Sequence, residues 1–253
     1  MTPWERPNYN EPMLRDFETW QNEIVRTLGD PTIGLRYLVL GSRFPRVFNY
    51  GGDLELFTRH ILAGDREGLV RYGKACVSIL HRNMRGLGLP LITIALVQGD
   101  ALGGGFESVL SFDVVIAERG ARFGLPETMF GLFPGMGAHS FLSRRLGSAR
   151  AEEMIRSGRL YTAEELHALG LVHILVESGE GEAAAADYIE RSHRHHAGQL
   201  GARRAARRVE NISLAELEEI VEFWADSALD LSPAQLKMMG RLAGAQSRLS
   251  LPS

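Results

Sequence analysis

Two glutamates in this sequence follow turns that would expose them, and together they could carry out acid–base chemistry. Glu107 comes directly after three glycines in the stretch GDALGGGFES. Glu127 follows Pro126, which fixes the backbone just before it, in the stretch FGLPETMFGLFPGMGAH. When two carboxyl groups share one site, their pKa values are pushed apart, so that one can accept a proton while the other donates one. The pair is therefore a candidate for general acid–base catalysis.

The three glycines before Glu107 are explained if a ligand must approach the main chain. Consecutive glycines are costly, because glycine loses the most conformational freedom on folding. They follow a predicted strand and precede a predicted short helix, whose first N–H groups have no partner within the helix. Such N–H groups suit a phosphate or an oxygen that gains negative charge during a reaction. A second glycine pair, Gly51 and Gly52, precedes Asp53 in FNYGGDLELF and offers the same kind of backbone.

The known phosphate-binding patterns do not match the triple glycine. A P-loop requires a lysine that is absent here, and the dinucleotide-binding fingerprint requires a glycine at the position that Ser108 occupies. A close-packed turn without a ligand explains a triple glycine by itself equally well. An isolated glutamate is likewise most simply explained as a favourable charge at a helix terminus. These simpler interpretations stay open for each feature taken alone.

The elements that would position these residues alternate between strands and helices. Short apolar runs that are rich in β-forming residues predict buried strands at residues 36–42, 91–99 and 112–118. Apolar residues at helical spacing predict helices at residues 12–28 and 69–84. This alternation favours an α/β core with mostly parallel strands.

Helix-capping patterns dominate the chain after about residue 145, where strand patterns almost disappear. Thr162 with Glu165 matches the capping box, and Ser213 with Glu216 matches it again. A serine followed by Pro233 predicts the start of a last helix. The C-terminal third is therefore predicted to be helical.

The composition is that of an ordinary globular protein. The chain has 253 residues, of which 45% are hydrophobic and 23% are charged, so it can form a sizeable core. Its formal net charge of −3 gives no basic field that would attract nucleic acid. The longest apolar run, residues 89–97, is too short to span a membrane. The single Cys76 and the absence of a signal-peptide pattern in residues 1–10 predict a soluble, cytoplasmic protein.

Two further clusters could carry chemistry but have simpler explanations. His193, His195 and His196 lack the spacing of a zinc-binding helix, so we predict a solvated polar stretch and no metal site. The arginine-rich segment 203–208 could contact a CoA phosphate or an acidic carrier protein, although a solvated helix face is the simpler interpretation.

Taken together, NYGGDL, VQGDALGGGFE and FGLPETMFGLFPGMG resemble the crotonase (enoyl-CoA hydratase/isomerase) superfamily. The resemblance extends from Arg6 to Arg248 and implies a ClpP/crotonase-like ββα-spiral core at residues 1–145. It also implies a C-terminal helical region at residues 146–253 that covers the acyl pocket and mediates trimerisation. Within the superfamily, FPGMGAHSF, WADSA and RLAGAQSR are most similar to the diffusible signal factor (DSF) synthase subgroup.

The resemblance implies roles for individual residues. Gly52 and Gly104 match the two oxyanion-hole amides of the superfamily, and Glu107 and Glu127 match its paired catalytic glutamates. Gly51 lies beside the first amide and is expected to line the thioester site. The positions of the subfamily's acyl pocket match Leu102, Met136, Trp224 and Leu242, although core packing explains Trp224 equally well.

The resemblance also implies a reaction. DSF synthases dehydrate a 3-hydroxyacyl thioester to a cis-2-enoyl product and can release the fatty acid. The substrate would be carried by CoA or by the phosphopantetheine of acyl carrier protein (ACP). No metal or redox cofactor is expected, because backbone amides would hold the enolate. The expected assembly is a homotrimer or hexamer. The alternatives are an enoyl-CoA hydratase or isomerase of fatty-acid degradation and a non-catalytic binding member of the superfamily.

Overall fold

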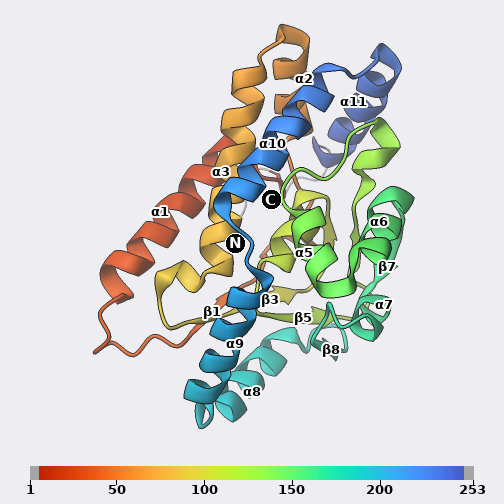
Figure 1. Cartoon of the computed structure of the whole chain (residues 1–253). Coiled ribbons are helices and arrows are strands. Elements are labelled where there is room, and N and C mark those ends of the chain that lie inside the picture. The colour runs from red at the N-terminus through yellow and green to blue at the C-terminus, as the bar shows by residue number, and fades with distance from the viewer. Residues whose placement is uncertain (1–5, 248–253) are drawn as a thin grey trace.

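The computed structural model describes residues 6–247, which form two four-stranded sheets surrounded by helices (Figure 1). The first sheet is parallel throughout and has the order β1 (Tyr37–Leu40), β3 (Ile92–Val97), β5 (Val114–Glu118), β8 (Ile174–Val176). The second has the order β2 (Val47–Asn49), β4 (Asp100–Leu102), β6 (Arg122–Gly124), β7 (Leu160–Thr162), with only β7 antiparallel to its neighbour. The predicted α/β class with mostly parallel strands is confirmed.

The longer predicted elements of the core are present, and the shortest ones were not predicted. Strands β1, β3 and β5 lie inside the three predicted strand ranges, and two helices match their predictions, α1 (Glu11–Leu28) and α3 (Arg66–Met84). Between them lies α2 (Leu54–Ala63), and a short 3₁₀ turn, η1 (Gly86–Gly88), precedes β3. The triple glycine begins α4 (Gly104–Leu110), as expected, and η2 (Pro126–Phe130) carries Glu127.

The C-terminal third is mostly helical, but the prediction that strands end near residue 145 is wrong, because β7 and β8 complete the two sheets. The predicted division at residues 145 and 146 falls at the end of α5, and the division itself stays a prediction. The helices from this point are α5 (Ala138–Leu146), α6 (Ser148–Ser157), α7 (Ala163–Ala168), α8 (Gly181–His193), α9 (His196–Glu210), α10 (Leu214–Leu229) and α11 (Pro233–Ser247).

One of the two predicted capping boxes is complete and the other is half-formed. Thr162 and Glu165 exchange both bonds at the start of α7. At the start of α10, the Ser213 hydroxyl accepts from the Glu216 N–H. The Glu216 carboxylate instead accepts from Ser140 and Arg144 on α5, so it ties α10 to α5 rather than capping its own helix.

The first sheet is covered on both faces, because successive side chains of a strand point to opposite sides. Ala95, Val97 and Val115 point into the main core, whereas Ile94 and Ile116 belong to a smaller cluster with residues of α8 and α9. Figure 1 shows α8 and α9 below β3 and β5, on the side away from α10. Fully buried strands of this kind read as continuous apolar runs, which is why the sequence predicted them.

Two C-terminal helices return over the N-terminal part of the chain. Helix α10 packs along α3, where Gly73 leaves room for Val221, and α11 packs against α2 and η2 (Figure 1). This arrangement brings Trp224 and Leu242 to the same cavity as the glycine-rich turns. Within residues 6–247, no helix is both long and apolar enough to cross a membrane.

Candidate active site

A cavity of about 280 Å³ lies between the two glycine-rich turns, η2 and the two last helices. The predicted site residues that line it are Gly52, Leu102, Gly104, Glu107, Glu127, Met136, Trp224 and Leu242. The ninth predicted residue, Gly51, is buried directly behind Gly104 and does not line the cavity. The fold thus brings residues from widely separated parts of the chain to one place.

The two glycine turns touch through their main chains. A side chain at Gly51 would place its Cβ 2.6 Å from the Gly104 nitrogen, and Gly51 has a φ of +82°. Gly51 is therefore restricted to glycine both by its conformation and by this contact. Within residues 6–247, the amides of Gly52 and Gly104 donate no hydrogen bond. Two free N–H donors consequently adjoin the same cavity.

Each glycine of the triplet is in close contact with a different neighbour. A Cβ at Gly103, whose φ is +52°, would lie 2.5 Å from Oε1 of Glu127. A Cβ at Gly104 would lie 2.3 Å from the Met136 sulfur, and one at Gly105 would lie 2.0 Å from the Asn49 carbonyl oxygen. The three consecutive glycines are therefore required by close approach from three sides.

Glu107 is buried, with 1% of its surface exposed, and is held by the main chain of another segment. Its Oε1 accepts two hydrogen bonds of 2.8 Å, from the N–H groups of Met136 and Ala138. Burial raises the pKa of Glu107 to about 7, although the two backbone hydrogen bonds act in the opposite direction. Glu107 is therefore fixed in position and titrates near neutrality.

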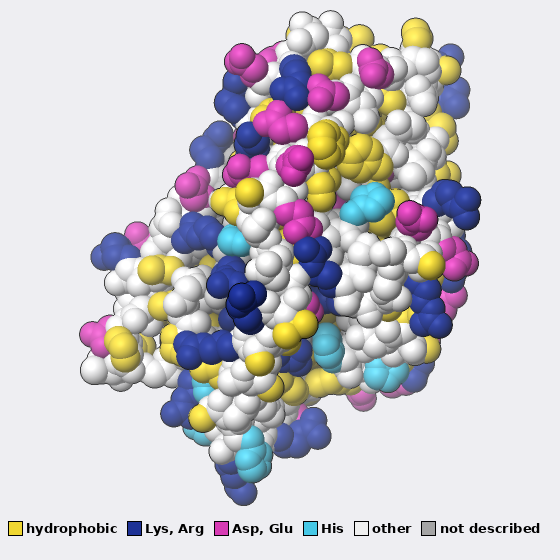
Figure 2. Space-filling view, in the orientation of Figure 1, with side chains coloured by type: hydrophobic (Ala, Val, Ile, Leu, Met, Phe, Trp, Pro, Cys, Tyr) yellow, Lys and Arg dark blue, Asp and Glu magenta, His cyan; other side chains and the backbone are white. Residues whose placement is uncertain are grey.

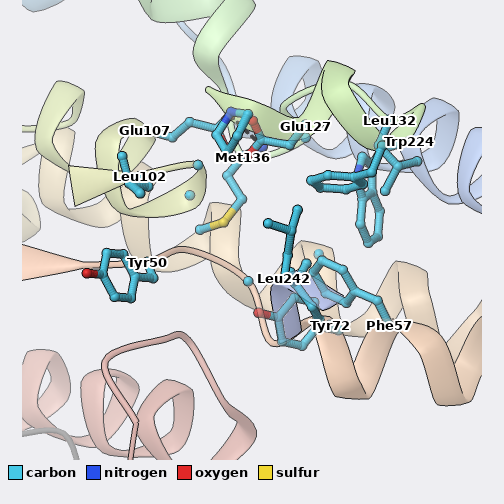
Figure 3. A pocket seen from close by; sticks show the side chains of 18 of the residues that line it. Tyr50, Phe57, Tyr72, Leu102, Glu107, Glu127, Leu132, Met136, Trp224 and Leu242 are labelled. Atoms are coloured by element: carbon cyan, nitrogen blue, oxygen red, sulfur yellow. Dashed lines mark hydrogen bonds between the residues drawn. The ribbon is translucent and has the colours of Figure 1, made fainter. Parts of the chain in front are cut away.

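Glu127 lies in a less polar setting at the same cavity (Figure 3). Its Oε2 is buried without a hydrogen-bond partner in the described chain. Burial raises its pKa well above the ordinary value, and the neighbouring Glu107 carboxylate raises it further. Because only Glu107 receives N–H donors, a single negative charge on the pair is better stabilised on Glu107, and the proton belongs on Glu127.

Away from the glycine turns, the cavity wall is apolar. Figure 3 shows Leu242 between Met136 and Tyr72, with Trp224 and Leu132 to one side. Trp224 is 6% exposed and meets Phe57 edge-on, with their ring centroids 4.9 Å apart. Trp224 thus belongs to the core and lines the cavity, so both interpretations of it hold. An apolar compartment of this kind can accept a hydrocarbon chain.

Several polar residues at the cavity were not predicted from the sequence. Tyr50, Asp100 and Arg122 line its other end, where Arg122 and Asp100 form an ion pair of 2.7 Å. The Tyr72 hydroxyl accepts from the Asp53 N–H and donates to the Tyr9 carbonyl, so it braces the first glycine turn. No spacing in the sequence indicated these residues, because they come from strand ends and from a helix face far along the chain.

The two decoy clusters have different outcomes. Among residues 6–247, no group of three or more His, Cys, Asp or Glu side chains is placed to hold a metal ion. The prediction that residues 203–208 form a solvated helix face is wrong for Arg207, which is buried and paired with Asp113. That arginine is needed where α9 docks on the first sheet, because Asp113 lies at the start of β5.

The sequence was also compared with protein families. Residues 25–210 match the family described as enoyl-CoA hydratase/isomerase, which is well over half of the chain. The chain belongs to the enoyl-CoA hydratase/isomerase family. The crotonase fold and a crotonase-type family membership are thereby established, with the cavity described above as the candidate site of this family member.

Individual relatives agree with the family assignment. The chain is 38% identical over 156 residues to human "Enoyl-CoA hydratase domain-containing protein 2, mitochondrial", an alignment that covers 59% of this chain and 49% of the relative. It is 35% identical over 152 residues to rat "Methylglutaconyl-CoA hydratase, mitochondrial", covering 59% and 46%. The matched region thus spans about half the length of these relatives.

The fold agrees with solved structures of the hydratase/isomerase family. A crystal structure of enoyl-CoA hydratase from Bacillus halodurans superposes with a TM-score of 0.70 at 25% sequence identity, covering 93% of this chain and 90% of that one. The similarity therefore extends across nearly the whole chain, including the C-terminal helices that complete the cavity.

Proposed function

We propose that this member of the enoyl-CoA hydratase/isomerase family removes water from 3-hydroxyacyl thioesters to give 2-enoyl thioesters, and that the reaction is reversible. One observation carries the proposal: Glu107, Glu127 and the amides of Gly52 and Gly104 adjoin a single cavity with an apolar extension. Catalytic roles for these four residues, and substrate contact by the wall residues, are part of the proposal.

The two amides would stabilise the charge that develops on the thioester oxygen. Loss of the α-proton turns the thioester into an enolate, whose oxygen carries negative charge. Preorganised N–H donors stabilise such an oxygen, and removing one donor in other enzymes costs about 3–4 kcal/mol. Both turns are held in advance, the first by Tyr72 and the second by the start of α4. Binding would therefore require little rearrangement of these turns.

The two carboxyl groups would move the protons. Dehydration needs one carboxylate to accept the α-proton and one carboxylic acid to protonate the hydroxyl that leaves as water. Hydration reverses both transfers. The pair must therefore hold a single proton throughout, and the unequal surroundings of Glu107 and Glu127 favour that state near neutral pH.

The finer assignment follows from the sequence resemblance to DSF synthases. We infer a 3-hydroxyacyl chain on CoA or on the phosphopantetheine of ACP, a cis-2-enoyl product, and thioester hydrolysis as a second activity. The apolar wall formed by Leu132, Trp224 and Leu242 supports a substrate with a hydrocarbon tail.

The test is a product analysis with purified protein. 3-Hydroxyacyl chains of several lengths, on CoA and on ACP, are incubated with the protein, and the products are separated and identified by mass spectrometry. The proposal predicts loss of one water with a cis double bond and release of free fatty acid. Glu107→Gln and Glu127→Gln, tested in parallel, should each abolish water loss. If no substrate loses water with the wild-type protein, the proposal is wrong.

The relatives' names favour a second candidate, an enoyl-CoA hydratase of fatty-acid degradation. The same assay separates the two, because that enzyme would form only the trans product and only from CoA substrates. A non-catalytic binding protein is the third possibility. It would require that the glutamine variants retain all biological activity.

A further inference from the structure

A second cavity, of about 230 Å³, lies on the other side of α4 from the glycine turns, between α5, α9 and the end of β5. It shares no lining residue with the candidate active site. Its wall is strongly polar, with three arginines, a histidine and two carboxylates. These residues are Asp113, Arg145, His173, Arg203, Arg207 and Glu210.

One of the three arginines is already neutralised. The Arg207 side chain donates to both carboxylate oxygens of Asp113 and to the Leu91 carbonyl, and only 9% of its side chain is exposed. Asp113 also accepts from the N–H and the hydroxyl of Thr93. This pair is therefore complete, and it forms a rigid floor where α9 meets the first sheet.

The other two arginines have no such partner. Arg203 lies one helical turn before Arg207 on α9, and Arg145 approaches from α5. Within residues 6–247, neither guanidinium has a carboxylate oxygen within 4 Å or a recorded hydrogen bond. Poor solvation lowers the pKa of Arg145, and Arg203 adds to that effect, while Glu210 and Asp113 oppose it. A partly buried cation without a close partner is unfavourable until an anion joins it.

The remaining groups leave room for an anion. His173 uses Nδ1 to accept the Val115 N–H, so its neutral ring carries the proton on Nε2. Burial and the two arginines lower the pKa of His173 to about 4, which keeps the ring neutral at physiological pH. Glu210 is the one other charge in the lining and makes no ion pair in the described chain. Arg145, Arg203 and Glu210 together leave one positive charge uncompensated.

We propose that this cavity binds a small oxyanion, a phosphate group or a carboxylate, between the guanidinium groups of Arg145 and Arg203, with the His173 Nε2–H as a third donor. The planar fork of arginine matches the oxygens of both anions. Basic side chains gather over the face of α9 that Figure 2 shows, which would favour approach of an anion to this side of the molecule. The site does not depend on the proposed catalytic activity.

Binding of inorganic phosphate, and separately of acetate, is measured by isothermal titration calorimetry at constant ionic strength, with chloride as the reference salt. Wild-type protein should bind one anion per chain. Arg145→Gln and Arg203→Gln should each weaken binding by about tenfold or more, because each removes a charge-assisted contact. Arg204→Gln removes a charge from the neighbouring, exposed position of α9 and should leave binding unchanged.

The outcomes are separable. If wild type binds neither anion more tightly than chloride, or if all three variants bind alike, the proposal is wrong. If the two variants instead reduce the mass of an assembly measured by light scattering, without any anion binding, the arginines face a carboxylate of a second copy and the proposal is also wrong. Should Arg145→Gln not fold, Arg203→Gln carries the test. Anion binding should persist in Glu107→Gln, which distinguishes this site from the proposed active site.

Discussion

At the scale of single residues, the two glutamates are chemically identical but differ in what surrounds them. Glu107 accepts two main-chain N–H bonds, whereas the Oε2 of Glu127 has no partner in the described chain. Both are desolvated, so both bind a proton more tightly than an exposed glutamate. The environment thus assigns the negative charge to one and the proton to the other, which identical side chains alone could not do.

Activity should therefore depend on pH near neutrality. Below about pH 7, Glu107 becomes protonated while Glu127 already holds a proton, so the pair loses its base. We expect kcat/KM to fall about tenfold for each pH unit below the apparent pKa of the pair. The profile is measured with one 3-hydroxyacyl thioester over the range where the protein stays folded. A flat profile through pH 7 would rule out Glu107 as the base.

The same burial should cost stability as pH rises. An unfolded glutamate ionises near 4.5, whereas folding raises the pKa of Glu107 to about 7, so its contribution is favourable below pH 4.5 and is lost as pH approaches 7. Glu107→Gln keeps an oxygen acceptor for both N–H groups and cannot ionise. We expect this variant to gain at least about 1 kcal/mol of unfolding free energy relative to wild type between pH 4.5 and pH 7. Urea titrations at both pH values measure the difference, and an equal offset at both would contradict it.

At the scale of elements, the site depends on two turns that touch through backbone alone. Gly51→Ala would place a methyl group 2.6 Å from the Gly104 nitrogen and force a φ of +82° on alanine. We expect kcat/KM to fall by about 10²–10³-fold, the usual cost of one lost oxyanion donor. Gly201→Ala is the matched control, since its Cβ would meet nothing within 4 Å and it lies within a helix. Equal activity of both variants would show that the turns need not approach each other.

The elements also show what a sequence can predict. Long apolar runs such as residues 91–99 identified the buried strands, because a strand covered on both faces has no polar alternation. Strands β2, β4 and β7 have three residues each, too few to show any period, and they form because longer neighbours offer open edges. Motifs located the glutamates and glycines. They could not locate Tyr72 or Arg122, whose positions at the cavity are set by tertiary packing alone.

At the scale of the whole molecule, the cavity is assembled from both ends of the chain. Residues of the first 55 positions supply one glycine turn, and α10 and α11 supply Trp224 and Leu242 on the opposite wall. The site therefore exists only when the C-terminal helices dock on α2 and α3. This explains why residues so distant in sequence belong to one site.

The assembly expected from the family resemblance can be tested at this scale. We expect the protein to form a homotrimer or a hexamer, with a mass three or six times that of one chain. Light scattering coupled to size-exclusion chromatography measures this over a range of protein concentrations. A mass of one chain at every concentration would contradict the expectation, without bearing on the chemistry of the cavity.

The most direct test of the central claim is a crystal structure with a bound, unreactive acyl-thioester analogue. The account predicts that the thioester oxygen lies about 3 Å from both the Gly52 and the Gly104 nitrogen. It also predicts that Glu107 and Glu127 flank the α- and β-carbons and that the acyl chain extends toward Trp224. An oxygen that contacts neither amide, or glutamates that face away from these two carbons, would contradict it.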